Sequence, residues 1–169
     1  MSDEATANTK QASGSADQRV FLVVVDNSQE MRVALRFAAR RAAHTGGRVA
    51  MLYVTEPSDF QHWMAVGDLM REEARQEAEA VLQRLSDEVV RLGGSIPVLF
   101  VREGDRAEEL LKLIEEERSI SIVVLAAGTG REGPGPIITN LLAKRAGQLH
   151  TPFTIVPGVL TDAEIDEIS

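Results

Sequence analysis

The sequence has no cysteine among its 169 residues, which excludes disulfide bonds and thiolate metal sites. It also has no long apolar run, since Val20–Val25 is far short of the roughly 20 residues that a membrane helix needs. The first ten residues, MSDEATANTK, contain acids where a secretory signal would have a basic patch and an apolar stretch. We therefore expect a cytoplasmic protein without a membrane partner.

Basic charge is scarce as well. The 18 Lys and Arg residues against 26 Asp and Glu residues give a net charge of -8. Of this charge, -2 falls on residues 1–18 and -4 on residues 161–169, which leaves -2 for the segment between them. Affinity for nucleic acids comes largely from clustered Lys and Arg. The composition therefore argues against a nucleic-acid partner.

The chain divides into a central domain and two polar ends. Residues 1–18 have no large apolar residue after Met1, so we expect a disordered N-terminal tail. Residues 19–158 form one domain, and residues 159–169 are expected to be an acidic C-terminal tail with at most a short helical turn. Short apolar runs in the domain predict strands that are covered on both faces, as in a parallel sheet. These runs are Val20–Val25, Val49–Val54, Val98–Val101, Ile120–Ala127 and Phe153–Val156.

Four segments between these runs have the spacing of amphipathic helices. The longest has an apolar stripe from Val66 to Leu92, and the last has Ile138, Leu141, Leu142 and Leu149, with Gly147 near its end. The resulting β-α alternation predicts an α/β fold with a parallel sheet between layers of helices.

Ligands of open parallel sheets bind at the carboxyl ends of the strands, so the loops there are the candidate sites. The most unusual is the glycine-rich loop Gly128–Pro136 after the fourth predicted strand. Its literal G-x-G-x-x-G does not lie in the first β-α turn, and no acid follows at the distance that a dinucleotide site requires. NAD binding is therefore not expected.

Five ordered segments resemble the universal stress protein family. They are VVVDNSQEMRVAL, LYVTEP, VREGDRAEELLKLIEEE, SIVVLAAGTG and TPFTIVPG, and the resemblance covers residues 19–158. It implies a three-layer α/β sandwich of the adenine nucleotide alpha hydrolase-like type, with a five-stranded parallel sheet in the order 3-2-1-4-5. It also implies homodimers through the last strand and, in one branch of the family, ATP held between the first and fourth strands.

The nucleotide-binding branch carries G-x-x-G-x9-G-[S/T] after the fourth strand, and this chain departs from that motif. Counting back from Thr151 puts Thr139 and Asn140 at its last two positions, and no register satisfies all of it. Thr139 adds a Cβ where backbone must approach phosphate, whereas Asn140 can still donate a hydrogen bond. The nucleotide-binding residues that the resemblance implies are Asp26, Val54, Gly128, Gly130, Gly133, Gly135, Thr139 and Asn140.

Structural explanations compete with these assignments. The glycine-rich loop can be a flexible connection in which Pro136 enters the first turn of a helix. Ser28 and Asp105 are expected to cap the helices that follow them, while Asp26 fits a turn residue and a nucleoside contact equally well.

Other residues give no catalytic or metal-binding constellation. His44, His62 and His150 have no second ligand at metal spacing, and no catalytic motif is present. The apolar residues of Phe60–Met64 are expected to be a core contact or a lid, with a protein-binding patch as the alternative.

The sequence therefore predicts a dimeric, stress-linked regulatory or binding module with weak or absent nucleotide binding and no catalytic residues. The alternative is a universal stress protein that binds ATP, with magnesium, and hydrolyses it slowly. A third and weaker candidate is an adenosine-cofactor or electron-transfer domain of related topology, which would need a second domain or partner.

Overall fold

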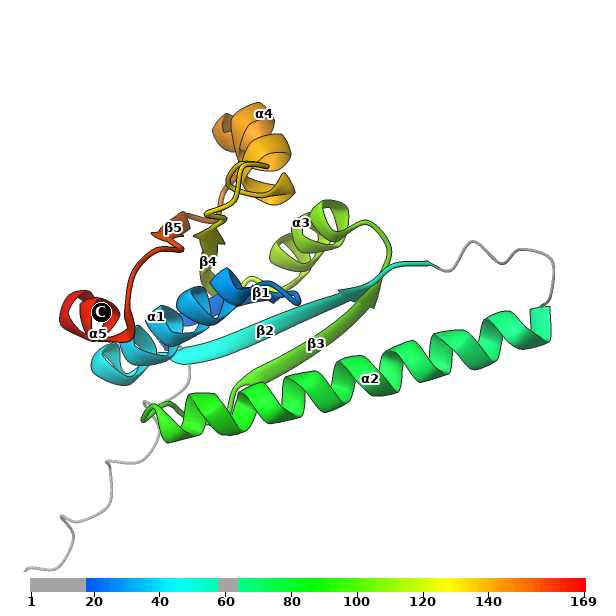
Figure 1. Ribbon diagram of the computed structural model, residues 1–169, viewed down its shortest axis with the longest axis horizontal. Coiled ribbons are helices and arrows are strands. Elements are labelled where there is room, and N and C mark those ends of the chain that lie inside the picture. The colour runs from blue at the N-terminus through cyan, green and yellow to red at the C-terminus, as the bar shows by residue number, and fades with distance from the viewer. Residues whose placement is uncertain (1–17, 58–63) are drawn as a thin grey trace, which may run out of the picture.

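A five-stranded parallel sheet lies at the centre of the computed structural model, which describes residues 18–57 and 64–169 (Figure 1). The strand order is β3-β2-β1-β4-β5, which confirms the order that the resemblance implied. Each predicted apolar run forms a strand, with ends that differ by at most two residues. The strands are β1 (Val20–Val25), β2 (Arg48–Thr55), β3 (Val98–Glu103), β4 (Ile120–Ala127) and β5 (Phe153–Pro157).

Helices α1 (Gln29–Thr45) and α2 (Met64–Arg91) cover one face of the sheet. Side chains of β1 alternate between the two faces, and Phe21, Val23 and Val25 pack in the cluster that contains Leu35 of α1 and Leu85 of α2. β1 is buried on both sides because it is the central strand. This double burial explains its unbroken apolar sequence.

The opposite face is covered by α3 (Arg106–Glu116) and by η1 (Ile137–Leu142). Leu22 and Val24 of β1 pack there with Leu110 and Leu113 of α3. The molecule is thus a three-layer α/β sandwich in which the carboxyl ends of β1, β2 and β4 lie along one edge, as parallel strands require.

The apolar stripe predicted along α2 is buried only in the second half of the helix. Val66 and Leu69 are 46% and 60% exposed, whereas Ala78 and Leu82 are fully buried. The 28 residues of α2 span about 42 Å, while the eight residues of β2 span about 26 Å. The first turns of α2 therefore extend past the carboxyl ends of the strands (Figure 1), while Arg71 still lies 3.2 Å from Glu103 at the end of β3.

The fourth predicted helix is not a single α-helix. The chain forms a π-helical segment, η1, followed by α4 (Ala143–Arg145) and a 3-10 turn, η2 (Ala146–Gln148). A π-helix has wider turns than an α-helix, and here Ile138 and Leu142 are only partly buried against the cluster that contains Leu141. Of the predicted stripe only Leu141 is buried, and Leu149 lies beyond the last turn.

The C-terminal segment differs from the appendage that the sequence predicted. It contains α5 (Asp162–Ile168), which packs against α1. Thr161 and Glu164 form a capping box at its start, because each side chain accepts a hydrogen bond from the other residue's backbone N–H. Ile165 is fully buried beneath the helix.

Opposite charges at matching spacing bind α5 to α1. Arg36 lies 3.2 Å from Asp162 and 2.6 Å from Asp166, and Arg40 lies 3.3 Å from Asp166. The hydrogen bond from Arg36 holds the pKa of Asp166 below its usual value of 3.8. Charges four residues apart share one helix face, so the acids that suggested a solvated tail instead pair with bases of α1.

Candidate functional site

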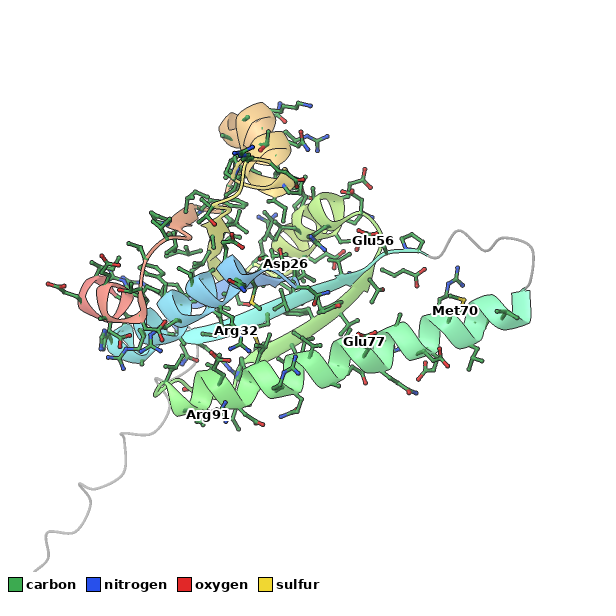
Figure 2. All side chains as sticks on the ribbon, viewed as in Figure 1. Asp26, Arg32, Glu56, Met70, Glu77 and Arg91 are labelled. Atoms are coloured by element: carbon green, nitrogen blue, oxygen red, sulfur yellow. The ribbon has the colours of Figure 1, made fainter. Side chains whose placement is uncertain are left out.

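The turn after β1 fixes the carboxylate of Asp26. Its Oδ1 accepts hydrogen bonds from the backbone N–H of Ser28 at 2.8 Å and from the Ser28 hydroxyl at 2.5 Å. Ser28 Oγ in turn accepts from the N–H of Met31, which confirms that Ser28 caps α1. The other oxygen of Asp26, Oδ2, faces the start of α3, with Nη1 of Arg106 4.0 Å away. Figure 2 labels Asp26 at this end of the sheet.

The glycine-rich loop after β4 is closed on itself. The N–H of Gly128 donates to the carbonyl of Pro134 at 3.1 Å, and the N–H of Gly133 donates to the carbonyl of Gly130 at 3.3 Å. A Cβ on Gly128 would come within 2.8 Å of the Gly133 oxygen, so a side chain there would force the loop apart. Gly133 and Gly135 have φ values of +89° and +106°, which other residues rarely adopt.

A carboxylate of α1 holds the start of this loop. Oε1 of Glu30 accepts hydrogen bonds from the N–H of Thr129 at 3.2 Å and from its hydroxyl at 2.9 Å. The backbone N–H of Glu30 itself, followed by these two groups of Thr129, keeps the pKa of Glu30 below its usual value. Glu30 is therefore an anion at neutral pH. The sequence placed it in the first turn of a helix but gave no sign of a partner 99 residues away.

The two residues at the end of the broken motif have different surroundings. Both the N–H and the hydroxyl of Thr139 donate to the carbonyl of Gly135, at 3.0 and 2.8 Å. The Thr139 hydroxyl is thus used within its own helical turn. Asn140 is exposed and lines a cavity.

That cavity, the larger of two that share Pro136 and Ile137, has a volume of about 570 Å³. It lies between the end of β2, the start of α3 and the start of η1. Its volume is within the range of about 300–1,000 Å³ that is typical of small-molecule sites. The residues that line it are Glu56, Pro57, Gly104, Asp105, Arg106, Ala107, Pro136, Ile137 and Asn140.

The smaller cavity, of about 190 Å³, lies between the end of β1 and the glycine-rich loop. It shares Pro136 and Ile137 with the larger cavity, so the two are neighbours. Its polar side chains are those of Asp26, Ser28 and Glu30.

The eight predicted site residues are only partly brought together. Asp26, Gly128 and Gly135 line the smaller cavity, and Asn140 lines the larger one. The side chain of Val54 is 4% exposed and packs in the core below the strand ends, so only its backbone could meet a ligand. Like Val54, the residues Gly130, Gly133 and Thr139 line neither cavity.

Arg106 is a cavity residue that the sequence analysis missed. It is the first residue of α3, directly after Asp105, whose Oδ1 accepts from the N–H groups of Ala107 and Glu108 at 3.0 Å each. The predicted cap at Asp105 is thereby confirmed. A basic residue directly after a predicted helix cap was the available signal, but only the fold shows that its side chain lies beside Asp26.

The remaining candidates do not add to the site. Nδ1 of His44 lies 2.8 Å from the backbone oxygen of Ser169. No group of three potential metal ligands lies together in residues 18–57 and 64–169, and no helix there is long and apolar enough to cross a membrane. His62 and the predicted apolar group Phe60–Met64 lie outside what the structure describes.

Several solved structures share this fold. A universal stress protein family member from Burkholderia pseudomallei aligns with a TM-score of 0.63 and 22% identity over 84% of this chain and 98% of its own. A universal stress protein in complex with cAMP aligns with a TM-score of 0.59 and 20% identity, covering 82% and 96%. One from Arabidopsis thaliana with AMP bound aligns with a TM-score of 0.53 and 11% identity, covering 82% and 91%. These TM-scores show a common fold.

Membership of a family rests on the sequence itself. No curated protein matches the chain. The family model described as Universal stress protein family matches residues 18–157, a range that contains all five strands and both cavities' lining residues. The chain therefore belongs to the universal stress protein family.

Proposed function

We propose that this chain is a regulatory module that binds an adenine nucleotide weakly in the larger cavity and does not use it as a substrate. The observation that carries the proposal is the cavity of about 570 Å³ between β2, α3 and η1, beside the fixed carboxylate of Asp26. The structural neighbours that hold cAMP and AMP support an adenine nucleotide as the ligand class.

The glycine-rich loop accounts for weak binding. In a phosphate site its backbone N–H groups would point at the ligand. Here the N–H of Gly128 already has the Pro134 carbonyl as its partner, and the Thr139 hydroxyl bonds to Gly135. The ionised Glu30 beside the loop also repels an anion. A nucleotide would therefore rely on contacts outside the loop.

Calorimetric titration with AMP and with ATP, each with and without Mg²⁺, tests this function. We expect dissociation constants in the micromolar to millimolar range and no release of phosphate from ATP. Asp26→Asn keeps an oxygen acceptor for Ser28 but replaces Oδ2, which faces the start of α3, with an amide donor. The loss of this acceptor for a nucleoside hydroxyl or amine should weaken AMP binding by roughly tenfold. Asp68→Asn on the overhanging part of α2 is the matched control and should bind as the wild type does. Phosphate release at a steady rate would favour the ATP-hydrolysing alternative, and no binding of either ligand would refute the proposal.

We also propose that the protein forms a homodimer through β5. This strand lies at one edge of the sheet, and an open edge strand normally pairs or is covered. Ile155 on β5 is 39% exposed, and Leu99 on the opposite edge strand, β3, is 38% exposed. Sedimentation at micromolar concentration should therefore show a dimer that Ile155→Lys dissociates and Leu99→Lys does not. A monomeric wild type, or equal effects of the two variants, would contradict a dimer through β5.

A further inference from the structure

Arg106 is the one basic side chain among the described residues that line the larger cavity. Its side chain is 34% exposed, yet its Nε is buried and has no hydrogen-bond partner in the described part of the chain. Nη1 lies 4.0 Å from Oδ2 of Asp26, which is too long for a hydrogen bond. Buried donors without a partner are rare, so this guanidinium is held in the cavity wall with unused hydrogen-bonding capacity.

The carboxylates around Arg106 limit what it can bind. In the larger cavity Asp105 already accepts two backbone hydrogen bonds, and Glu56 adds a second negative charge. The neighbouring smaller cavity has Asp26 and Glu30 in its wall, and no Lys or Arg among the described residues that line it. The positive charge of the two cavity walls is thus concentrated at one guanidinium, and the cavity beside the glycine-rich loop has two carboxylates without a base among its described lining residues.

We propose that Arg106 binds the phosphate of the nucleotide, and that the site therefore selects a nucleoside monophosphate over both the uncharged nucleoside and the triphosphate. This inference rests on the proposed function, because it requires an adenine nucleotide in the larger cavity. A guanidinium donates two parallel hydrogen bonds to one phosphate group. An uncharged nucleoside has no phosphate to accept them. Two further phosphates would add negative charge beside Asp26 and Glu30 without a second base to offset it.

Arg106 has a competing role as a purely positioning residue. Its distance of 4.0 Å from Asp26 would allow it to orient that carboxylate for a nucleoside contact without touching phosphate. In that case the loss of Arg106 would lower the affinities for adenosine and for AMP by the same factor. The comparison of the two ligands therefore separates a phosphate contact from an effect through Asp26.

The test is calorimetric titration of the full chain with adenosine, AMP and ATP at low ionic strength. We expect the wild type to bind AMP at least tenfold more tightly than adenosine or ATP, since hydrogen bonds to a charged group contribute roughly tenfold to a hundredfold in affinity. Arg106→Gln should reduce the affinity for AMP to that for adenosine and leave the affinity for adenosine unchanged. Arg102→Gln is the matched control, because Arg102 is 30% exposed, bonds to Glu116 and does not line the larger cavity.

The outcomes distinguish this inference from the proposed function. If AMP binds but Arg106→Gln leaves its affinity unchanged, or if the wild type prefers ATP, the inference is overturned and the proposed function stands. If none of the three ligands binds the wild type, both fail. Arg106→Lys keeps the positive charge but lacks the planar guanidinium, so it should bind AMP with an affinity between those of the wild type and Arg106→Gln. If the glutamine variant does not fold, the lysine variant tests the phosphate contact in its place.

Discussion

Replacement of Ile165 by alanine tests whether α5 is part of the folded body. The change removes three carbon atoms from a fully buried side chain, and at about 0.8 kcal/mol for each the lost transfer free energy is about 2.4 kcal/mol. Measured Ile→Ala changes in protein cores are about 2–5 kcal/mol, depending on how far the site can collapse. Because α5 lies at the surface and can settle toward α1, we expect about 2–3 kcal/mol.

The assay is urea unfolding followed by far-UV circular dichroism at pH 7. If the same variant is unfolded by heat, the expected loss in the free energy of unfolding corresponds, for a chain of this length, to a fall in melting temperature of roughly 5–10 °C. Ile168→Ala is the control, because Ile168 lies on the same helix and is 55% exposed. It should change the free energy of unfolding by less than about 0.5 kcal/mol. If the two variants have the same stability, α5 does not pack on α1 in solution and the reasoning is refuted.

Three further changes test other parts of the molecule. Asp166→Asn should destabilise the protein at pH 7. Because the pKa of Asp166 is lower in the folded than in the unfolded protein, the difference in stability from the wild type should vanish as pH falls well below 3.8, which urea unfolding at a series of pH values measures. Gly158→Ala should cost about 1–3 kcal/mol in the same assay, since its Cβ would collide with the Ala127 carbonyl, whereas Gly147→Ala meets nothing within 4 Å and should be nearly neutral. Thr139→Gly with Asn140→Ser restores the end of the glycine motif and should strengthen ATP binding by roughly twofold to tenfold in calorimetry; unchanged affinity would mean that the closed loop is the main obstacle.

The sequence predicted the sheet well because its signal is local. Every strand is a short apolar run, and double burial of a central strand such as β1 leaves no polar alternation to confuse the pattern. The exposed Val66 and Leu69 were not predictable in the same way, since periodicity shows which face of α2 is apolar but not how far the sheet beneath it extends. The packing of α5 was missed because its acids find their partners on α1, more than 120 residues earlier.

The candidate site was harder to predict than the fold. Resemblance led to Asp26 and to the glycine-rich loop, and the caps at Ser28 and Asp105 followed from local rules that the structure confirms. The Gly128–Pro134 hydrogen bond and the position of Arg106 depend on tertiary structure. A motif gives the spacing of residues, but it does not show which of their donors already have partners.

The closed glycine-rich loop has a consequence for the kinetics of binding. A ligand that uses the N–H of Gly128 must first break its hydrogen bond to Pro134, so the measured affinity is the intrinsic affinity reduced by the fraction of molecules in which the loop is open. With a net value of about 0.5–1.5 kcal/mol for one hydrogen bond, that fraction is roughly one in three to one in ten. For such a ligand, the observed association rate would level off at the rate of loop opening as its concentration rises.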